Sequence, residues 1–366
     1  MSSIITPVRL LGLSHPELVQ FVKSLGESAS AADRLFRYIH RDAAASFNEM
    51  EDFSSSFRSK LGEVAVLDIL QPVAETVSAD SQTRKTLFRL EDGKTIESAL
   101  MLFRNSATGR ERRTVCVSTQ VGCALGCPYC ATGQQGFERN LSAAEIIGQV
   151  LYFARTFGTM TLEQEVGNNR NRVTHVVFMG MGEPLANYDN VVRAIAILNS
   201  QKGMGLGFHQ VTLSTAGLVP QIARLADEKF QFQLAVSLHA AADELRISLV
   251  PVNQKYPLDQ LIPACREYAV RSGRKVFIEY ALFEGVNDSV GQADALIKLL
   301  EGLSCSINLI VGNPTCSDGF QPSSREKALA FQKKLIAGGI RTMLRVSRGS
   351  DIEAGCGQLR SRWLGT

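Results

Sequence analysis

The apolar positions of the first 70 residues follow helical spacing. In residues 16–25 and again in residues 31–40, an apolar side chain recurs every three or four positions, so these side chains share one helix face. A turn rich in Ser, Gly and Ala separates the two segments. We expect a small helical accessory domain over residues 1–75, although a helical cap on the following domain fits the same pattern.

A different pattern begins near residue 84. Residues 85–90 and 95–103 are rich in apolar and β-branched side chains, and Asp92-Gly93 lies between them. An Asp-Gly pair favours the tight turn that joins two antiparallel strands. The sequence therefore predicts a β-hairpin, which with its linker occupies residues 76–113.

From residue 114 onward, strand patterns alternate with helix patterns. The expected strands are residues 114–118, 173–179, 210–215, 232–238, 275–282, 304–311 and 341–347. The expected helices lie near residues 142–157, 188–200, 219–228, 258–271, 289–301 and 323–338. The first of them opens with Ser142 and Glu145, the spacing of a capping box. This alternation predicts an α/β domain with a parallel sheet and right-handed connections.

The strands are too few for a closed eight-stranded barrel. A partial (β/α) TIM-like barrel and a doubly wound sheet both fit, and in either fold the site lies at the C-terminal ends of the strands. We assign residues 114–347 to this domain and residues 348–366 to a C-terminal loop and tail.

The composition indicates a folded protein without a membrane span. Of the 366 residues, 45% are hydrophobic and 20% are charged, which excludes a disordered chain. The sequence has neither a run of about 18 apolar residues nor a signal-peptide pattern, so we expect a cytoplasmic protein. The net charge of +3, from 39 basic and 36 acidic residues, neither requires nor excludes a nucleic-acid partner.

Arginines gather in two places. One group precedes residue 114, and the other lies in residues 341–366, where five arginines stand against two acidic residues (5 − 2 = +3). We expect both near the mouth of the site, where a phosphate backbone would pass, although a solvated charged surface fits as well. The residues are Arg104, Arg110, Arg112 and Arg113 in the first group, and Arg341, Arg345, Arg348, Arg360 and Arg362 in the second.

The cysteines carry the clearest chemical signal. Four of the eight lie within residues 116–130, and Cys123, Cys127 and Cys130 have the spacing C-x₃-C-x₂-C after the first strand of the α/β domain. Three thiolates can bind three irons of a [4Fe–4S] cluster and leave the fourth iron open. A zinc site would require a fourth Cys or His nearby, and Cys116 lies in the strand instead. An open cluster is favoured, and zinc or coincidence are the alternatives.

This motif, with Tyr129 before the last cysteine, resembles the radical S-adenosylmethionine (SAM) superfamily. In that superfamily the open iron binds SAM, and an electron from the cluster cleaves SAM to a 5′-deoxyadenosyl radical. Seven further segments are similar to the RlmN family of RNA adenosine methyltransferases, within residues 84–360. They are residues 116–123, 131–141, 178–185, 214–217, 237–240, 313–314 and 348–359.

The resemblance implies a joint task for two distant cysteines. Adenine C2 is electron-poor and cannot attack the methyl group of SAM, whereas a cysteine thiolate can. One SAM would methylate Cys356, and a second would yield the radical that activates this methyl group for addition to C2. Glu97 would accept the proton that leaves C2. Cys116 would attack the Cys356 sulfur, releasing the product and leaving a transient disulfide.

The resemblance also implies the cofactor contacts. The cofactors would be one [4Fe–4S] cluster and SAM, with two SAM molecules used per turnover. Gly182 and Glu183 would meet the amino group of SAM. Polar groups at strand ends would bind its ribose and carboxylate; these are at Ser214, Ser237, Leu238, His239 and Asn313.

The implied substrates are RNA loops, because C2 is reached only when the adenine is unstacked. They are an adenosine in the peptidyl-transferase loop of 23S ribosomal RNA, before full ribosome assembly, and one in the anticodon loop of some transfer RNAs. The resemblance further implies an electron donor such as flavodoxin or ferredoxin, and a monomer.

Three alternatives stay open on the sequence alone. A Cfr-type enzyme methylates C8 of the same adenosine and confers antibiotic resistance, but residues 134–137 and 182–185 look more like RlmN. Another radical enzyme, such as a glycyl-radical activase, has no use for Cys116 and Cys356. A non-enzymatic iron–sulfur or zinc RNA-binding protein would not cleave SAM.

Overall fold

The first part of the chain is helical, as the sequence predicts. A computed structural model describes residues 7–67, 69–104, 111–159, 172–228, 232–311, 320–345, 350–352 and 357–365. Its first helices are α1 (His15–Ser24), α2 (Ala29–His40) and α3 (Ser55–Val64), and the short strands β1 (Val8–Arg9) and β2 (Ala65–Val66) pair in parallel. The apolar faces of these helices join the main core of the protein.

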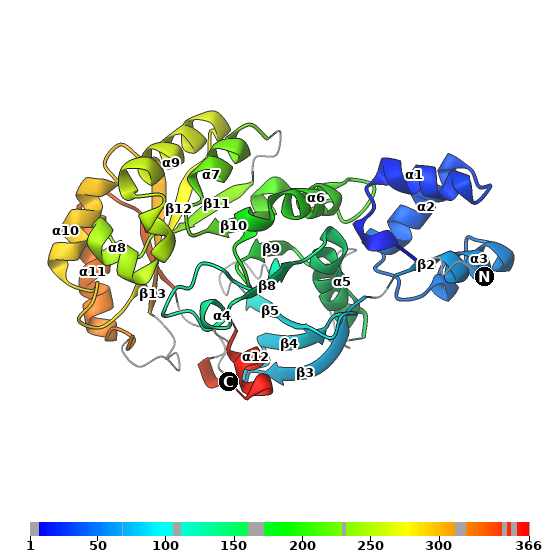
Figure 1. Ribbon diagram of the computed structural model, residues 1–366, viewed down its shortest axis with the longest axis horizontal. Helices are drawn as coiled ribbons and strands as arrows, with labels where there is room; N and C mark the ends of the chain where they lie inside the picture. Colours follow the sequence, from blue (N-terminus) through cyan, green and yellow to red (C-terminus); the bar gives the residue numbers. More distant parts are fainter. Residues whose placement is uncertain are drawn as a thin grey trace.

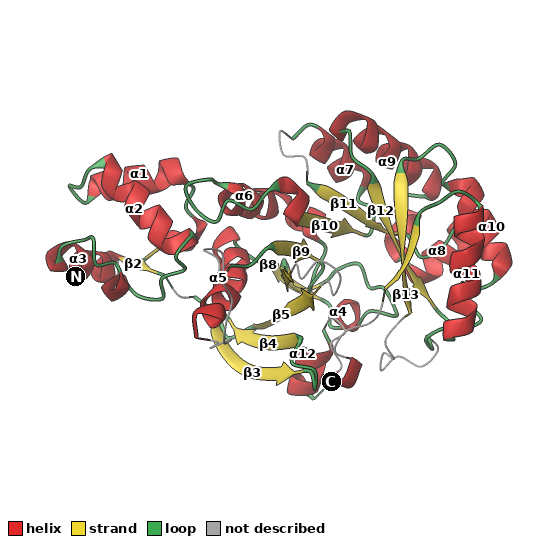
Figure 2. Cartoon of the chain, turned by 180° about the vertical axis from the view of Figure 1, so that it is seen from behind, coloured by secondary structure: helices red, strands yellow, loops and turns green. Residues whose placement is uncertain are grey.

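This helical part packs beside α5 (Ala143–Thr159) and α6 (Tyr188–Asn199), as Figures 1 and 2 show. Arg155 of α5 donates hydrogen bonds to the carbonyls of Ala43 (2.9 Å) and Ala44 (3.1 Å). Arg193 of α6 donates to the carbonyl of Gly12 at 2.8 Å. The helical segment is therefore bonded to the α/β domain as well as joined to it by the chain.

One ten-stranded sheet runs through the rest of the molecule. Its strand order is β14-β13-β12-β11-β10-β9-β6-β5-β4-β3. The parallel strands are β6 (Glu111–Cys116), β9 (His175–Phe178), β10 (Val211–Thr215), β11 (Gln233–Ser237), β12 (Val276–Leu282), β13 (Cys305–Val311) and β14 (Thr342–Arg345). Because these strands lie side by side in chain order, the fold is the partial barrel and not the doubly wound sheet.

The predicted hairpin is confirmed as β4 (Thr83–Arg89) and β5 (Thr95–Arg104). It is not a separate extension, because β5 pairs antiparallel with β6 and so continues the barrel sheet. The sequence analysis missed β3 (Gln71–Val77), which pairs antiparallel with β4. Most side chains of β3 are exposed or half-buried, so the apolar pattern of a strand is weak there.

All six predicted helices of the α/β domain are present. Besides α5 and α6 they are α7 (Val219–Ala226), α9 (Leu258–Ser272), α10 (Val290–Leu299) and α11 (Arg325–Ala337), and the structure adds α8 (Asp243–Leu249). The predicted capping box is confirmed, since the Ser142 N–H donates to the Glu145 carboxylate at 2.8 Å. None of the described helices is long and apolar enough to cross a membrane.

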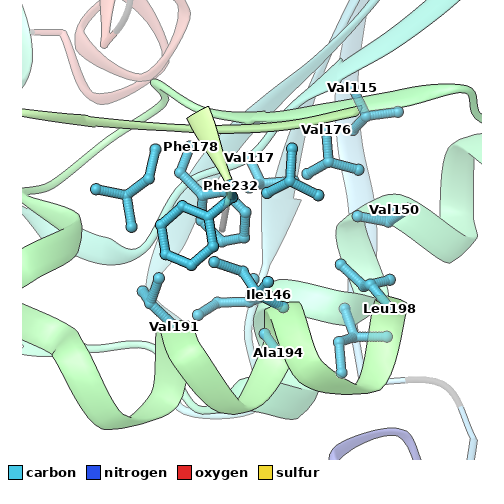
Figure 3. Close-up of a cluster of buried hydrophobic side chains, with 14 of the residues drawn as sticks. Val115, Val117, Ile146, Val150, Val176, Phe178, Val191, Ala194, Leu198 and Phe232 are labelled. Atoms are coloured by element: carbon cyan, nitrogen blue, oxygen red, sulfur yellow. The ribbon is translucent and has the colours of Figure 1, made fainter. Parts of the chain in front are cut away.

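The core lies between the parallel strands and their covering helices. Figure 3 shows Val115 of β6 and Val176 of β9 beside Val150 of α5 and Leu198 of α6, all fully buried. Burying such side chains stabilises the fold by about 1.5–3 kcal/mol each. This packing fixes β6 and β9, whose C-terminal ends lead into the loops described next.

Candidate active site

The three motif cysteines lie in a loop that is closed at its base. The loop runs from β7 (Gln120–Gly122) to α4 (Ala131–Gln134), and β8 (Phe137–Asn140) returns to pair with β7. The Cys123 N–H donates to the carbonyl of Gly136 at 2.8 Å. Gly122 has a φ of 74°, and a Cβ there would lie only 1.7 Å from the Gly136 carbonyl oxygen. Only glycine at this position allows the two ends of the loop to lie so close together.

The donor set suits an iron–sulfur cluster, which takes one thiolate per iron. Burial raises the pKa of Cys123 and of Cys127 to about 12, and the three thiols lie near enough to affect one another's charge. Within the described residues, no three His, Cys, Asp or Glu side chains are arranged to hold one metal ion.

Tyr129, which lies within this loop, packs against three other aromatic rings. The ring of Tyr129 lies 5.2 Å from the rings of both His239 and Phe283, and 6.4 Å from that of Phe320. These side chains shield one side of the cysteine loop from water. Low solvent access is one of the factors that set the potential of an iron–sulfur centre.

Gly182 and Glu183 lie directly after β9, within a short loop against β7. Gly182 has a φ of 99°, and a Cβ there would lie 2.5 Å from the Cβ of Gln120. The Glu183 carboxylate accepts hydrogen bonds from the backbone N–H groups of Leu185 (2.9 Å) and Ala216 (2.8 Å). Burial raises the pKa of Glu183, and these hydrogen bonds oppose the increase. The carboxylate thus joins the loop after β9 to the end of β10.

His239 follows Ser237 at the end of β11 and is held in one orientation. Its backbone is left-handed, with a φ of 60°. Its Nδ1 accepts a hydrogen bond from the Ala281 N–H at 2.9 Å, and its carbonyl accepts one from Asn287 at 2.8 Å. Burial lowers the pKa of His239 to about 3, so the ring stays neutral at physiological pH. Ser214 and Ser237 are both half-buried on neighbouring strands.

Arg246 of α8 is a buried residue that the sequence analysis missed. Its guanidinium donates to the carbonyls of Ala216 (2.6 Å), Ser237 (3.2 Å) and Leu238 (3.1 Å). It also donates to Oδ1 of Asn253 at 2.6 Å. These contacts join the C-terminal end of β10 to that of β11. A single arginine in an unpredicted seven-residue helix gave no sequence signal for this role.

Cys116 is the last residue of β6, where the sequence analysis expected it. It pairs with Ala99 of β5 and Val177 of β9. Burial raises its pKa to about 12, and the nearby Glu97 charge adds to the increase. The same carboxylate acts on Cys130. Cys116 and Cys130 of the cysteine loop therefore both lie close enough to Glu97 for its charge to affect them.

Glu97 of β5 is buried and engaged on two sides. Nζ of Lys85, on β4, lies 2.7 Å from its carboxylate, and the two side chains are only 3% and 4% exposed. The carboxylate also accepts the backbone N–H of Gly357 at 2.9 Å and the backbone N–H of Arg360. Gly357 directly follows Cys356 in the chain.

Most of the predicted site residues share one edge of the barrel. The cysteine loop, Gly182 and Glu183, Ser214, and residues 237–239 follow or end adjacent strands at their C-terminal ends. Glu97 reaches the same region from the antiparallel part of the sheet. Asn313 and Cys356 lie outside the described residues, as do Arg110 and Arg348.

One expectation about charge is wrong. Arg360 was expected on a basic surface, but its side chain is only 6% exposed and pairs with Glu138. A buried, paired guanidinium cannot contact a phosphate backbone. Arg341, Arg345 and Arg362 are exposed.

Comparisons with known proteins identify the family of this chain. Residues 117–296 match the family model of the radical SAM superfamily, and residues 8–67 match that of the ribosomal RNA large subunit methyltransferase N-terminal domain. A probable dual-specificity RNA methyltransferase RlmN from Moorella thermoacetica is 44% identical, over 97% of this chain and 98% of that protein. A dual-specificity RNA methyltransferase RlmN from Syntrophobacter fumaroxidans is 45% identical, over 96% and 98%.

A solved structure extends the likeness to three dimensions. The crystal structure of a radical SAM methyltransferase from Sphaerobacter thermophilus superposes with a TM-score of 0.89 at 43% identity. The match covers 96% of this chain and 99% of that one. On its sequence and its fold, the chain belongs to the RlmN family of radical SAM RNA methyltransferases.

Proposed function

We propose that this protein methylates C2 of adenine in RNA, at adenosine 2503 of 23S ribosomal RNA and at adenosine 37 of some transfer RNAs. One observation supports a reaction shared between distant parts of the chain. Glu97 lies on the strand beside Cys116 and accepts the N–H of Gly357, the residue after Cys356. The proposed proton acceptor therefore links the strand of one catalytic cysteine to the segment of the other.

The proposed division of labour follows from side-chain chemistry. When bound, the [4Fe–4S] cluster and two SAM molecules per turnover supply the methyl group and the 5′-deoxyadenosyl radical. Cys123, Cys127 and Cys130 hold the cluster, and Cys356 carries the methyl group to the base. The family implies a cluster and SAM, and the buried cysteine loop fits that assignment.

The remaining steps are proton and thiol chemistry. Glu97 accepts the proton from C2. Its carboxylate is near enough to Cys116 for its charge to affect that thiol, which places a base beside one of the two proposed catalytic cysteines. As the C2 proton leaves, the radical adduct also gives up one electron, which a bound cluster would accept. The Cys116 thiolate then attacks the sulfur of Cys356: an S–S bond forms, the S–CH₂ bond breaks, and the released CH₂ group takes up a proton to become the methyl group on C2. Cellular thiols reduce that disulfide for the next turnover. Burial holds Cys116 as a neutral thiol until a base takes its proton.

The proposed SAM contacts lie along the strand ends. Gly182 and Glu183 meet its amino group, while Ser214, Ser237 and His239 bind its ribose and carboxylate together with the Leu238 backbone and Asn313. The geometry of the described residues supports this, because the neighbouring strands β9, β10 and β11 lead to Gly182 and Glu183, Ser214, and residues 237–239 at one edge of the barrel. A flavodoxin or ferredoxin supplies the electron, and the enzyme acts as a cytoplasmic monomer on RNA that is not yet fully assembled into ribosomes.

Product analysis tests this proposal. The reconstituted enzyme is incubated anaerobically with 23S ribosomal RNA or transfer RNA, SAM and a reductant, and the nucleosides are separated by mass spectrometry. We expect 2-methyladenosine together with 5′-deoxyadenosine. Cys356→Ala should abolish methylation, whereas Cys116→Ala should leave RNA covalently attached to the protein, because no second thiol releases it. A product consisting only of 8-methyladenosine would instead assign the Cfr-type reaction.

A further inference from the structure

Arg360, in the C-terminal helix α12 (Gln358–Leu364), is bonded through all three of its guanidinium nitrogens. Nε donates to Oγ1 of Thr95 at 3.0 Å, Nη1 to Oε1 of Gln135 at 2.7 Å, and Nη2 to Oε1 of Glu138 at 2.7 Å. Its backbone N–H donates to Glu97. This one residue therefore binds four others.

The partners of Arg360 come from two parts of the catalytic edge. Thr95 lies on β5, two residues before Glu97. Gln135 and Glu138 follow the cluster ligand Cys130 by five and eight residues. Arg360 thus holds α12 against both the strand of the proposed proton acceptor and the end of the cysteine loop. Figures 1 and 2 show α12 beside α4.

Two further contacts tighten the same attachment. Gln135 donates through Nε2 to the carbonyl of Gly357 (3.0 Å) and to Oγ of Ser361 (2.8 Å). Gly357 has a φ of 83°, and a Cβ there would lie 2.6 Å from the backbone nitrogen of Thr132. Thr132 is the second residue after Cys130. The chain next to Cys356 therefore touches the loop of the proposed cluster ligands.

The burial of Arg360 makes this attachment specific. Its side chain is 6% exposed and forms an ion pair with Glu138, which also pairs with Lys94. A buried guanidinium is tolerated only while its N–H groups are hydrogen-bonded. Because the partners of Arg360 are fixed in β5 and around β8, α12 has one preferred position. A lysine offers a single ammonium and cannot reproduce a set of planar donors.

We propose that Arg360 is a positioning residue for the reaction of Cys356: it fixes Gly357, the residue after Cys356, and helix α12 against the cysteine loop and the strand of Glu97. This rests on the proposed role of Cys356 as the methyl carrier. In this role Arg360 acts through the position of its neighbours in the chain, and a misplacement of about 1 Å can slow an enzyme about 100-fold.

The test uses the reconstituted, full-length enzyme with Arg360→Met. We expect kcat for RNA methylation to fall about 100-fold, while KM for RNA and the iron and sulfide content stay within about twofold. Arg271→Met is the matched control, because it makes the same change at an exposed arginine of α9 whose ion pair with Asp227 lies at the surface; its kcat should stay within about twofold of the wild type. Arg360→Lys should not restore kcat.

A second measurement does not depend on RNA. In the same holoenzymes, iodoacetamide alkylation of Cys356 is followed by peptide mass spectrometry. We expect Arg360→Met to change the rate about tenfold or more, and Arg271→Met to leave it unchanged. If the wild type methylates no RNA but this difference appears, the proposed function fails while the positioning role stands.

Three outcomes would overturn the inference. They are a wild-type kcat in Arg360→Met, equal effects of Arg360→Met and Arg271→Met on alkylation, or a loss of iron from Arg360→Met. The last would mean that Arg360 maintains the cluster loop itself. If Arg360→Met does not fold, Gln135→Leu removes the bonds to Gly357, Ser361 and Nη1 of Arg360 and leaves the Arg360–Glu138 pair in place. It should lower kcat in the same way, and an unchanged kcat counts against the proposal.

Discussion

Lys85 and Glu97 form a buried ion pair between neighbouring strands, with 2.7 Å between Nζ and the carboxylate. The same carboxylate accepts N–H groups from Gly357 and Arg360. The C-terminal segment is therefore attached to a charge pair inside the sheet. The stability of the sheet and the position of α12 therefore depend on each other.

Lys85→Met should destabilise the protein by about 3–5 kcal/mol, because it leaves the Glu97 carboxylate buried without its countercharge. The midpoint of urea denaturation measures this effect. Lys334→Met is the control, since it breaks a pair with Asp294 in which the side chains are 40% and 56% exposed. The control should leave the midpoint unchanged. Similar losses in the two variants would contradict a special role for the buried pair.

Gly357→Ala should detach the C-terminal helix at a cost of about 1–3 kcal/mol. The new methyl group would collide with Thr132, and the positive φ adds backbone strain. Gly365→Ala has a similar φ of 71° but nothing within 4 Å of the new Cβ. Limited proteolysis should therefore cut the C-terminal segment faster only in Gly357→Ala. Equal cutting of both variants would assign the effect to φ alone.

His40→Leu should weaken the loss of stability in acid. Burial lowers the pKa of His40 from 6.5 to about 3, and neither ring nitrogen has a hydrogen-bond partner. Between these two values the unfolded chain binds a proton that the folded chain excludes, so stability falls as the pH falls. Removing this histidine should flatten the dependence by up to about 1.4 kcal/mol per pH unit.

Urea titrations at pH 7 and pH 5 measure that slope. Leu35→Ala, at a fully buried residue of the same helix, is the control: it should lower stability at both pH values but leave the slope unchanged, because it removes no titratable group. An unchanged slope in His40→Leu would show that His40 is not a source of the pH dependence.

Cys127→Ala should abolish cluster assembly, measured as iron and acid-labile sulfide, and with it the formation of 5′-deoxyadenosine. Cys265→Ala makes the same substitution at a fully buried thiol of α9. It should cost packing energy but retain the cluster. A cluster that survives Cys127→Ala would remove this thiol from the proposed ligand set.

Local features were predictable because their causes are local. The spacing of Cys123, Cys127 and Cys130 belongs to one loop, and the Ser142–Glu145 capping box spans a single turn. The strand and helix patterns from residue 114 onward hold because apolar periodicity reports one buried face. The sequence pattern did not predict β3 or α8. A largely exposed strand such as β3 and a seven-residue helix such as α8 each bury too few side chains to give a clear apolar period.

The sequence by itself determined the α/β class, the order of the elements and the grouping of Cys123, Cys127 and Cys130 in one loop. Only the tertiary structure decided between a partial barrel and a doubly wound sheet, because strand order depends on how the helices pack. It also joined Glu97 to Gly357, 260 residues away, and buried Arg360, whose charge alone predicted a surface contact. Contacts between distant residues and the burial of a charge depend on packing, which no local pattern encodes.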